Sequence, residues 1–266
     1  MSSLPTACPT LDAIDAKIAK VLTALQQEDA ASVNHAPGIT SPTSPGFSRT
    51  IDHTLLKPDA TEAQIDGLCD EAKRFGFKSC CVNSSWAKRV TDNLSGSGVL
   101  TCVVVGFPLG AMASEAKAFE TSTAIKNGAR EIDTVLPVGL LKSSNYPAVF
   151  DDLAATVVAA APYPVKVIIE TALLTDAQKV AACYIAAEAG AVFVKTCTGF
   201  SGGGATANDV RLMRKAVEYK EGKVMVKASA AVRDFRKCLE MLQAGADRIG
   251  TSSGVQIMEG AKGKGY

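Results

Sequence analysis

The chain has 266 residues, of which 47% are hydrophobic and 21% charged, and this is enough apolar material for one large core. Lysine and arginine number 28 against 27 for aspartate and glutamate, so the charge balance gives no electrostatic case for binding nucleic acid or an anionic membrane. No apolar run approaches the roughly 20 residues that span a bilayer, which excludes a membrane-spanning helix.

The cysteine and histidine usage indicates a reduced, cytoplasmic protein. None of the eight cysteines has the C-x-x-C spacing of a metal or redox motif, and several fall in predicted strands, where a free cysteine packs as a small hydrophobe. The two histidines, His35 and His53, are far apart in the chain. Because no histidine, cysteine and carboxylate cluster has the spacing of a zinc or iron site, we expect no metal.

The first 48 residues differ in composition from the rest of the chain. Apolar residues recur at nearly helical spacing from residue 11 to residue 27 and predict one amphipathic helix. Residues 28–48 are rich in alanine, serine, proline, threonine and glycine, as in a flexible connector. The segment lacks the basic and apolar regions of a secretory signal. We therefore expect residues 1–48 to be an extension that packs on the main domain, residues 49–266, or on a partner surface.

From residue 51 onward, predicted strands and helices alternate. The strands are expected at 51–56, 79–83, 100–107, 131–138, 165–171, 193–198, 224–230 and 248–252, and the helices near 61–75, 84–94, 114–128, 146–160, 175–190, 206–220 and 233–244. Eight such units predict a (β/α)8 TIM barrel, with a doubly wound parallel sheet as the alternative. In a barrel, the chemistry takes place at the carboxyl ends of the strands.

Two lysines end neighbouring apolar runs. Lys195 follows a buried strand, and Lys227 follows the next one about 32 residues later, which is one strand–helix–strand unit. If their amino groups lie about 6 Å apart at an effective dielectric near 20, they repel by roughly 2.8 kcal/mol, which lowers a lysine pKa by about two units. A neutral lysine amine forms Schiff bases with carbonyls. The alternative is a lysine whose stem packs on apolar surface while its head lies in water.

The fourth strand carries acidic residues in an apolar segment. Strand alternation places Glu131 and Asp133 on one face. If that face points into the barrel, Asp133 lies near the two lysines. It would then be either a proton shuttle for carbon–carbon cleavage through a Schiff base or a structural ion-pair partner.

The eighth strand runs into a turn of small residues, Gly-Thr-Ser-Ser-Gly at 250–254. Free backbone N–H groups at such a turn bind anions, and barrels commonly bind phosphate after strands seven and eight. The Ser-Gly-Gly-Gly run at 201–204 either adds backbone donors or is only a flexible loop.

Five motifs taken together resemble the deoxyribose-phosphate aldolase family. They are IDHTLLKP at 51–58, GFPLG at 106–110, EID at 131–133, FVKTCTGF at 193–200 and VKAS at 226–229, and the resemblance covers residues 50–258. It implies a metal-free class I aldolase on a (β/α)8 barrel that needs no cofactor. Such an enzyme reversibly cleaves 2-deoxy-D-ribose 5-phosphate to D-glyceraldehyde 3-phosphate and acetaldehyde, in deoxyribonucleoside and deoxyribonucleotide catabolism.

The resemblance also implies roles for individual residues. Lys195 would be the Schiff-base lysine, Lys227 the second lysine that perturbs it, and Asp133 the proton relay. The residues implied at the phosphate site are Gly199, Gly250, Ser252 and Ser253, and those implied near the rest of the substrate are Thr54, Cys81 and Tyr266. The expected partners are sugar phosphates, aldehydes and further copies of the chain in a dimer or tetramer, with no nucleic acid and no membrane.

One position departs from the family pattern. Where the family usually has Gly-Gly after the second lysine, this chain has Ala230 and Ala231. Glycine permits a positive φ and a close approach of phosphate, so we expect weaker phosphate binding with the chemistry intact. Two alternatives stay open: a lysine-dependent aldolase with a different aldol substrate, and a catalytically weak paralogue that binds sugar phosphates or uses residues 1–48 to dock on a protein.

Overall fold

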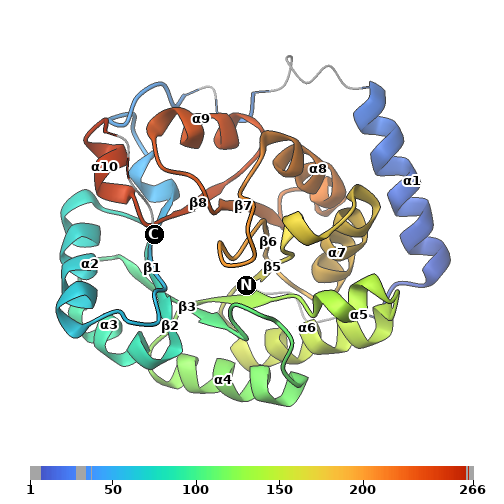
Figure 1. The fold of residues 1–266 in the computed structure, drawn as a ribbon, viewed down its shortest axis with the longest axis horizontal. Coiled ribbons are helices and arrows are strands. Elements are labelled where there is room, and N and C mark those ends of the chain that lie inside the picture. The colour runs from blue at the N-terminus through green and yellow to red at the C-terminus, as the bar shows by residue number, and fades with distance from the viewer. Residues whose placement is uncertain (1–6, 28–33, 37, 262, 264–266) are drawn as a thin grey trace.

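The structure is a computed structural model of the chain, and it describes residues 7–27, 34–36, 38–261 and 263. Eight parallel strands close into a barrel in sequence order, each pairing with its neighbours and β1 with β8 (Figure 1). The strands are β1 (Ile51–Leu55), β2 (Ser79–Asn83), β3 (Leu100–Val105), β4 (Glu131–Val135), β5 (Val165–Ile168), β6 (Phe193–Lys195), β7 (Met225–Ser229) and β8 (Arg248–Thr251). The predicted (β/α)8 barrel is confirmed, and the doubly wound sheet is excluded.

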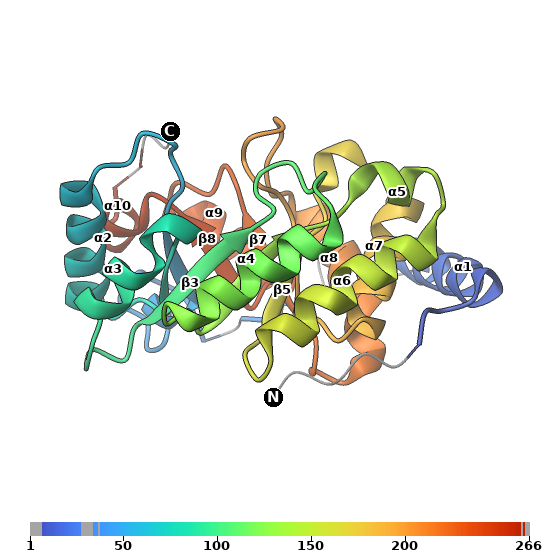
Figure 2. The same cartoon turned by 90° about the horizontal axis from the view of Figure 1, so that it is seen from below.

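Helices surround the barrel, and the side view shows α4 and α6 running together across its outer face (Figure 2). The helices are α1 (Leu11–Gln27), α2 (Glu62–Phe75), α3 (Ala87–Asn93), α4 (Ser114–Lys126), α5 (Val138–Lys142), α6 (Tyr146–Ala160), α7 (Asp176–Glu188), α8 (Ala207–Val217), α9 (Phe235–Gln243) and α10 (Gly254–Met258). Among the described residues, no helix is long and apolar enough to cross a membrane.

The predicted strands begin within one residue of the observed ones, but most of them end too late. The fourth was expected to reach residue 138, yet β4 ends at Val135, and Pro137 precedes the short helix α5. The sixth was expected to reach residue 198, yet β6 ends at Lys195 although Thr196 and Cys197 are still buried. The apolar pattern in the sequence indicates which residues are buried. Here the buried residues continue into loops that form no strand pairing, so the predicted strands are too long.

Threonine side chains cap the starts of three helices. Thr61 and Thr175 form capping boxes, and Thr206 accepts from a backbone N–H of the first turn of α8. Ser114 does not cap its helix. The N-cap of α4 is Ala113, which forms no side-chain cap, and the Ser114 hydroxyl donates to Asp152 on α6 instead.

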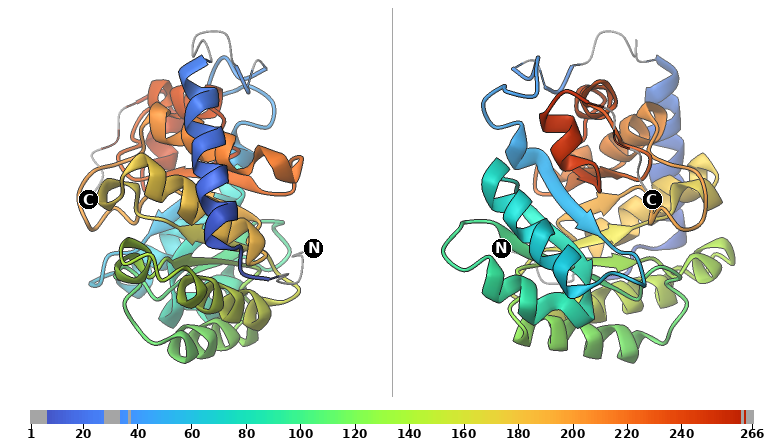
Figure 3. Two further views of the ribbon diagram at one scale, coloured as in Figure 1. Left: turned by 90° about the vertical axis from the view of Figure 1, so that its right-hand side faces the viewer. Right: turned by 60° about the vertical axis from the view of Figure 1, so that its left-hand side comes forward.

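The N-terminal helix α1 has the predicted bounds and lies against the outside of α7 and α8 (Figure 3, left). Its Ile14 and Val21 are buried in the core that the barrel and helices share. Residue 47 was assigned to a flexible connector, and that assignment is wrong at Phe47. This ring is fully buried, with its centroid 5.1 Å from that of Phe235 on α9.

Candidate active site

Seven charged side chains meet inside the barrel, and none is more than 7% exposed. The strand register explains the arrangement, because residues opposite each other on neighbouring parallel strands point the same way: Asp133 is opposite Lys166, and Lys195 is opposite Lys227. We call these residues the barrel cluster; they are Asp52, Glu131, Asp133, Lys166, Lys195, Lys227 and Arg248.

Asp133 lies at the centre of the barrel cluster. Its Oδ2 accepts from Nζ of Lys195 and from Nζ of Lys227, each at 2.8 Å, and its Oδ1 accepts from Nζ of Lys166 at 2.8 Å. Burial alone would raise the pKa of Asp133, but the ammonium groups of Lys166, Lys195 and Lys227 outweigh it and hold the pKa well below its usual range. The predicted inward face of β4 is confirmed, and Asp133 is a carboxylate anion.

Lys227 is held as a cation. Its Nζ is 2.6 Å from Asp52 Oδ2, in addition to its bond with Asp133, and the side chain is fully buried. Burial favours the neutral amine, but the carboxylates of Asp133 and Asp52 outweigh burial and raise the pKa of Lys227 above its ordinary value. Gly250 makes room for this side chain, because a Cβ there would stand 3.0 Å from the Lys227 Cε.

The expectation that two lysines simply repel each other was incomplete. It omitted the carboxylate between them and the further cations Lys166 and Arg248. Lys166 contacts Glu131 Oε2 at 2.7 Å, and Arg248 contacts Asp52 Oδ1 at 2.7 Å. The barrel cluster contains four basic side chains and three carboxylates, so the lysines interact within a network of both signs.

A cavity opens at the carboxyl ends of the strands, and Lys195 is the member of the barrel cluster that borders it. Four other predicted site residues also line the cavity: Thr54, Gly199, Gly250 and Ser252. Lining residues that the sequence analysis did not assign to the site include Thr198, Phe200, Ser229 and Arg233. Thus one lysine faces both the ionic network and the space where a substrate can bind.

Besides Asp133 and Lys227 of the barrel cluster, two predicted site residues lie outside the cavity lining, and a further one cannot be placed. Ser253 is 2% exposed, and the chain at Gly263 passes directly over it; a Cβ at Gly263 would stand 2.1 Å from the Ser253 Oγ. Cys81 is fully buried and does not line the cavity. Tyr266 lies outside the described residues.

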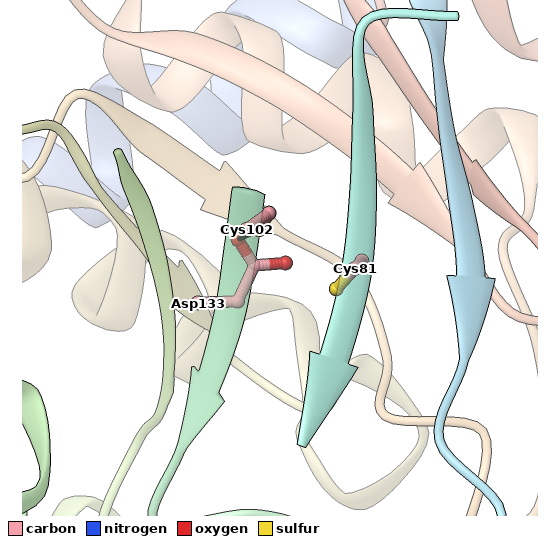
Figure 4. Close-up of side chains that lie close together, drawn as sticks. All are labelled: Cys81, Cys102 and Asp133. Atoms are coloured by element: carbon pink, nitrogen blue, oxygen red, sulfur yellow. Dashed lines mark hydrogen bonds between the residues drawn. The ribbon is translucent and has the colours of Figure 1, made fainter. Parts of the chain in front are cut away.

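Cys81 and Cys102 lie beside Asp133, on the neighbouring strands β2 and β3 (Figure 4). The Cys102 thiol donates to Asp133 Oδ1 at 3.1 Å. Ligand atoms of these three residues lie within 4.8 Å of one another, as in a metal site. Both Asp133 oxygens already accept from lysine ammonium groups, however, so a cation would have to displace those charges. We therefore interpret Cys81 and Cys102 as buried thiols beside Asp133 and not as metal ligands.

The two alanines that depart from the family pattern keep the backbone that glycine would favour. Ala230 and Ala231 have φ of 74° and 58°, in the left-handed region. Both line the cavity. The Ala231 methyl lies 2.6 Å from where a Cβ of Gly204 would stand, so the methyl packs against the glycine run at 202–204.

Three members of the ionic network were not predicted from the sequence: Asp52, Lys166 and Arg248. A signal was available for Lys166, which sits between Val165 and Val167 in a strand with every residue buried. A lysine inside such a run needs carboxylate partners, by the same reasoning that singled out Lys195. Asp52 follows Ile51 at the start of β1 and carried a similar signal.

A model of the DeoC/LacD aldolase family matches residues 49–260. The deoxyribose-phosphate aldolase of Brevibacillus brevis is 55% identical over 222 residues, which cover 83% of this chain and 99% of that protein. That of Clostridium tetani is 54% identical over 217 residues, 81% of this chain and 99% of that one.

Solved structures give the same likeness. A putative deoxyribose-phosphate aldolase from Coccidioides immitis superposes with a TM-score of 0.84 at 34% identity, covering 92% of this chain and 96% of that one. The deoxyribose phosphate aldolase from Aeropyrum pernix, described as having a unique tetrameric structure, superposes with a TM-score of 0.77 at 30% identity, covering 94% of this chain and 97% of that one.

Proposed function

The chain belongs to the DeoC/LacD family of aldolases, and on this premise we propose how its residues carry out class I aldol cleavage. The enzyme is a lyase that reversibly cleaves 2-deoxy-D-ribose 5-phosphate to D-glyceraldehyde 3-phosphate and acetaldehyde. We assign the Schiff base to Lys195, the relay of protons to Asp133, and the electrostatic support to Lys227.

The observation that carries the assignment is the unequal placement of the two lysines. Lys195 and Lys227 share one oxygen of Asp133, but Lys195 borders the cavity while Lys227 is fully enclosed. A nucleophile must reach the substrate, and a buried lysine held between two carboxylates cannot do so. This supports Lys195 as the nucleophile and Lys227 as a fixed cation.

The charges of the barrel cluster support the same assignment. With Lys195 as a neutral amine, the three remaining cations, Lys166, Lys227 and Arg248, balance the three carboxylates. The ionic network therefore stays charge-balanced while Lys195 is in its nucleophilic form.

In the proposed reaction, the Lys195 amine adds to C1 of the aldehyde, and the carbinolamine loses water to form an iminium ion. The C2–C3 bond then breaks, its electrons flow to the iminium, and the C3 hydroxyl loses its proton as C3 becomes the carbonyl of glyceraldehyde 3-phosphate. The enamine left on Lys195 takes a proton at C2, and hydrolysis releases acetaldehyde. Asp133, which already accepts from Lys195 and Lys227, would pass these protons through water.

We place the phosphate against the part of the cavity wall that small residues and a cation form. These lining residues are Gly199, Gly250, Ser252 and Arg233. Serine hydroxyls, free backbone N–H groups and a guanidinium are donors that suit a phosphate dianion. We propose no binding role for Ser253, because the chain at Gly263 covers it.

Borohydride trapping tests the assignment. The protein is incubated with 2-deoxy-D-ribose 5-phosphate and reduced, and the modified peptide is mapped by mass spectrometry. We expect an adduct on Lys195 that is absent in Lys195→Ala. An adduct on Lys166 or Lys227 instead, or none with either the sugar or acetaldehyde, would overturn the assignment.

The alanine pair favours a second candidate, a lysine-dependent aldolase that prefers a different aldol. The methyl groups of Ala230 and Ala231 line the cavity where the family has glycines. A comparison of kcat/KM for 2-deoxy-D-ribose with and without the 5-phosphate separates the two candidates. A preference for the unphosphorylated sugar would support the second.

We further propose that the enzyme works in the cytoplasm as a homo-oligomer, with residues 49–266 as the catalytic domain and residues 1–48 as an extension. All eight cysteines are free thiols, which supports a reducing compartment. Burial of Ile14 and Val21 against the chain's own helices supports an extension that packs intramolecularly. Light scattering of the purified protein tests the oligomeric state.

A further inference from the structure

Glu170 stands just beyond β5, at the cavity end of the barrel, in an unusual state. Its backbone is left-handed, with φ of 57° and ψ of 66°, which is uncommon for a residue with a side chain. The side chain is 2% exposed, and no basic side chain among the described residues forms a salt bridge with it. A buried carboxylate in a strained backbone conformation is often tied to function.

The Glu170 carboxylate binds the loop that follows the Schiff-base strand. Its Oε1 accepts from the Thr198 backbone N–H at 3.2 Å, and its Oε2 accepts from the Thr198 hydroxyl at 2.5 Å. The Thr198 oxygen in turn accepts from the Phe200 backbone N–H at 3.1 Å. One carboxylate thus holds the turn of Gly199, whose φ is 87°, directly beyond Lys195.

These contacts decide what the Thr198 hydroxyl can offer to a ligand. A threonine hydroxyl has one proton and two lone pairs. The proton is used by Glu170 and one lone pair by Phe200. Thr198 lines the cavity together with Lys195, and among the described residues its oxygen forms no other hydrogen bond. One lone pair of the Thr198 oxygen is therefore left for a ligand. The hydrogen bond from the Thr198 hydroxyl to the Glu170 carboxylate makes this oxygen a stronger acceptor.

We propose that Glu170 is a positioning residue that fixes Thr198 as a hydrogen-bond acceptor for a hydroxyl of the substrate. This inference rests on the proposed aldolase reaction. A phosphate oxygen of a dianion has no proton to donate, so this acceptor cannot serve the phosphate. It suits the hydroxyl on the carbon between the reacting carbonyl and the phosphate, which is the C2 hydroxyl of D-glyceraldehyde 3-phosphate. Glu170 would therefore set the preference for a hydroxylated acceptor aldehyde.

The test runs the reaction in the direction of synthesis, with acetaldehyde as donor and two acceptors. One acceptor is D-glyceraldehyde 3-phosphate, and the other is 3-oxopropyl phosphate, which lacks the hydroxyl. In Glu170→Gln, the amide nitrogen donates to Thr198 and removes the charge that polarises its oxygen. We expect the preference for the hydroxylated acceptor to fall about tenfold, mainly through KM. Turnover of 3-oxopropyl phosphate should stay within about twofold.

Two controls separate positioning from stability. Borohydride trapping of acetaldehyde on Lys195 does not involve the hydroxyl and should persist in Glu170→Gln. Glu221→Gln changes another left-handed glutamate, which is exposed and away from the cavity, and should leave the preference between acceptors unchanged. Should Glu170→Gln fail to fold, Thr198→Val removes the same acceptor and should abolish the preference.

An equal loss for both acceptors in Glu170→Gln would make the residue merely structural and overturn the proposal. An unchanged preference in both Glu170→Gln and Thr198→Val would overturn it as well. Wild-type protein that forms no adduct with acetaldehyde and turns over neither acceptor would overturn the proposed function, and the inference with it. If the wild type turns over both acceptors but the variants show either an equal loss or an unchanged preference, the inference alone is overturned and the proposed function stands.

Discussion

Lys195 and Lys227 lie opposite each other in the register of β6 and β7, yet only Lys195 reaches the cavity. The difference arises because β6 ends at Lys195, whereas β7 continues for two residues past Lys227 to Ser229. The register of β6 and β7 places both ammonium groups against Asp133. Lys195 lies at the mouth of the barrel, and Lys227 lies beneath it. This difference in position is the basis for assigning Lys195 as the nucleophile and Lys227 as the fixed cation.

Replacing Lys227 with methionine removes that fixed cation and leaves a side chain of similar length. The barrel cluster would then hold three cations and three carboxylates with Lys195 charged, so the charged form of Lys195 is favoured. We expect kcat at neutral pH to fall at least about 100-fold. The pH at which borohydride trapping of Lys195 reaches half its maximum should move upward. Lys237→Met, a half-buried lysine on α9 that does not line the cavity, is the control and should behave as wild type. An unshifted trapping profile in Lys227→Met would contradict the role.

Replacing Asp133 with asparagine breaks the centre of the barrel cluster. Three lysine ammonium groups lose their shared partner inside the barrel. Removing one partner of a buried ion pair typically costs about 3–5 kcal/mol of unfolding free energy. We expect a loss of this order in urea unfolding, together with a fall in kcat. Asp151→Asn, an exposed change on α6, serves as control. Full stability in Asp133→Asn would mean that Lys166 and Lys227 are already neutral, which would contradict their assignment as fixed cations.

The strand–helix alternation predicted the barrel because each strand reads as a buried run and is followed by a segment with helical spacing. Strand ends were harder, since residues such as Thr196 stay buried after the ladder stops. At the site, alternation placed Asp133 correctly because the side chain period of a strand is two. The partners Asp52 and Arg248 lie at opposite ends of the chain and meet only where β1 closes on β8.

Other parts of the site depend on contacts between distant segments, which no local sequence pattern predicts. Glu170 binds Thr198 only because β5 and β6 are neighbours and the backbone at Glu170 turns into the left-handed region. Ser253 was expected at the phosphate, but Gly263 lies against its side chain and covers it. Such coverage is a tertiary property and needs the structure.

The barrel cluster predicts how stability depends on pH. The pKa of Asp133 is depressed by folding, so its contribution to stability is present above the unfolded value of about 3.9 and is lost as pH falls through the lower folded value. The pKa of Lys227 is raised by folding, so its contribution is present below about 10.4 and is lost as pH rises through the higher folded value. From these two groups we expect no change in unfolding free energy across neutral pH. A urea series from about pH 5 to pH 9 checks this, and a steep slope there would contradict it.

Restoring glycine at residues 230 and 231 should improve phosphate binding. The backbone already has positive φ at both positions, so Ala230→Gly and Ala231→Gly relieve strain without moving the loop. They also remove two methyl groups from the cavity wall. We expect KM for 2-deoxy-D-ribose 5-phosphate to fall, with kcat little changed because Lys195 and Asp133 are untouched. An unchanged KM in the double variant would mean that the methyl groups do not obstruct phosphate.

Removing residues 1–33 tests what the N-terminal helix contributes. The deletion stops before Phe47, which is buried against Phe235 and belongs to the main domain. It exposes the surface of α7 and α8 that α1 covers, and it takes Ile14 and Val21 out of the core, each worth about 1.5–3 kcal/mol when fully buried. We expect a lower Tm by thermal unfolding with kcat retained, because α1 contributes no residue that lines the cavity with Lys195. The point variant Ile14→Ala in the full chain should give part of the same loss, about 2–5 kcal/mol. A deletion that leaves Tm unchanged but alters the oligomeric state would instead assign α1 to an interface between copies of the chain.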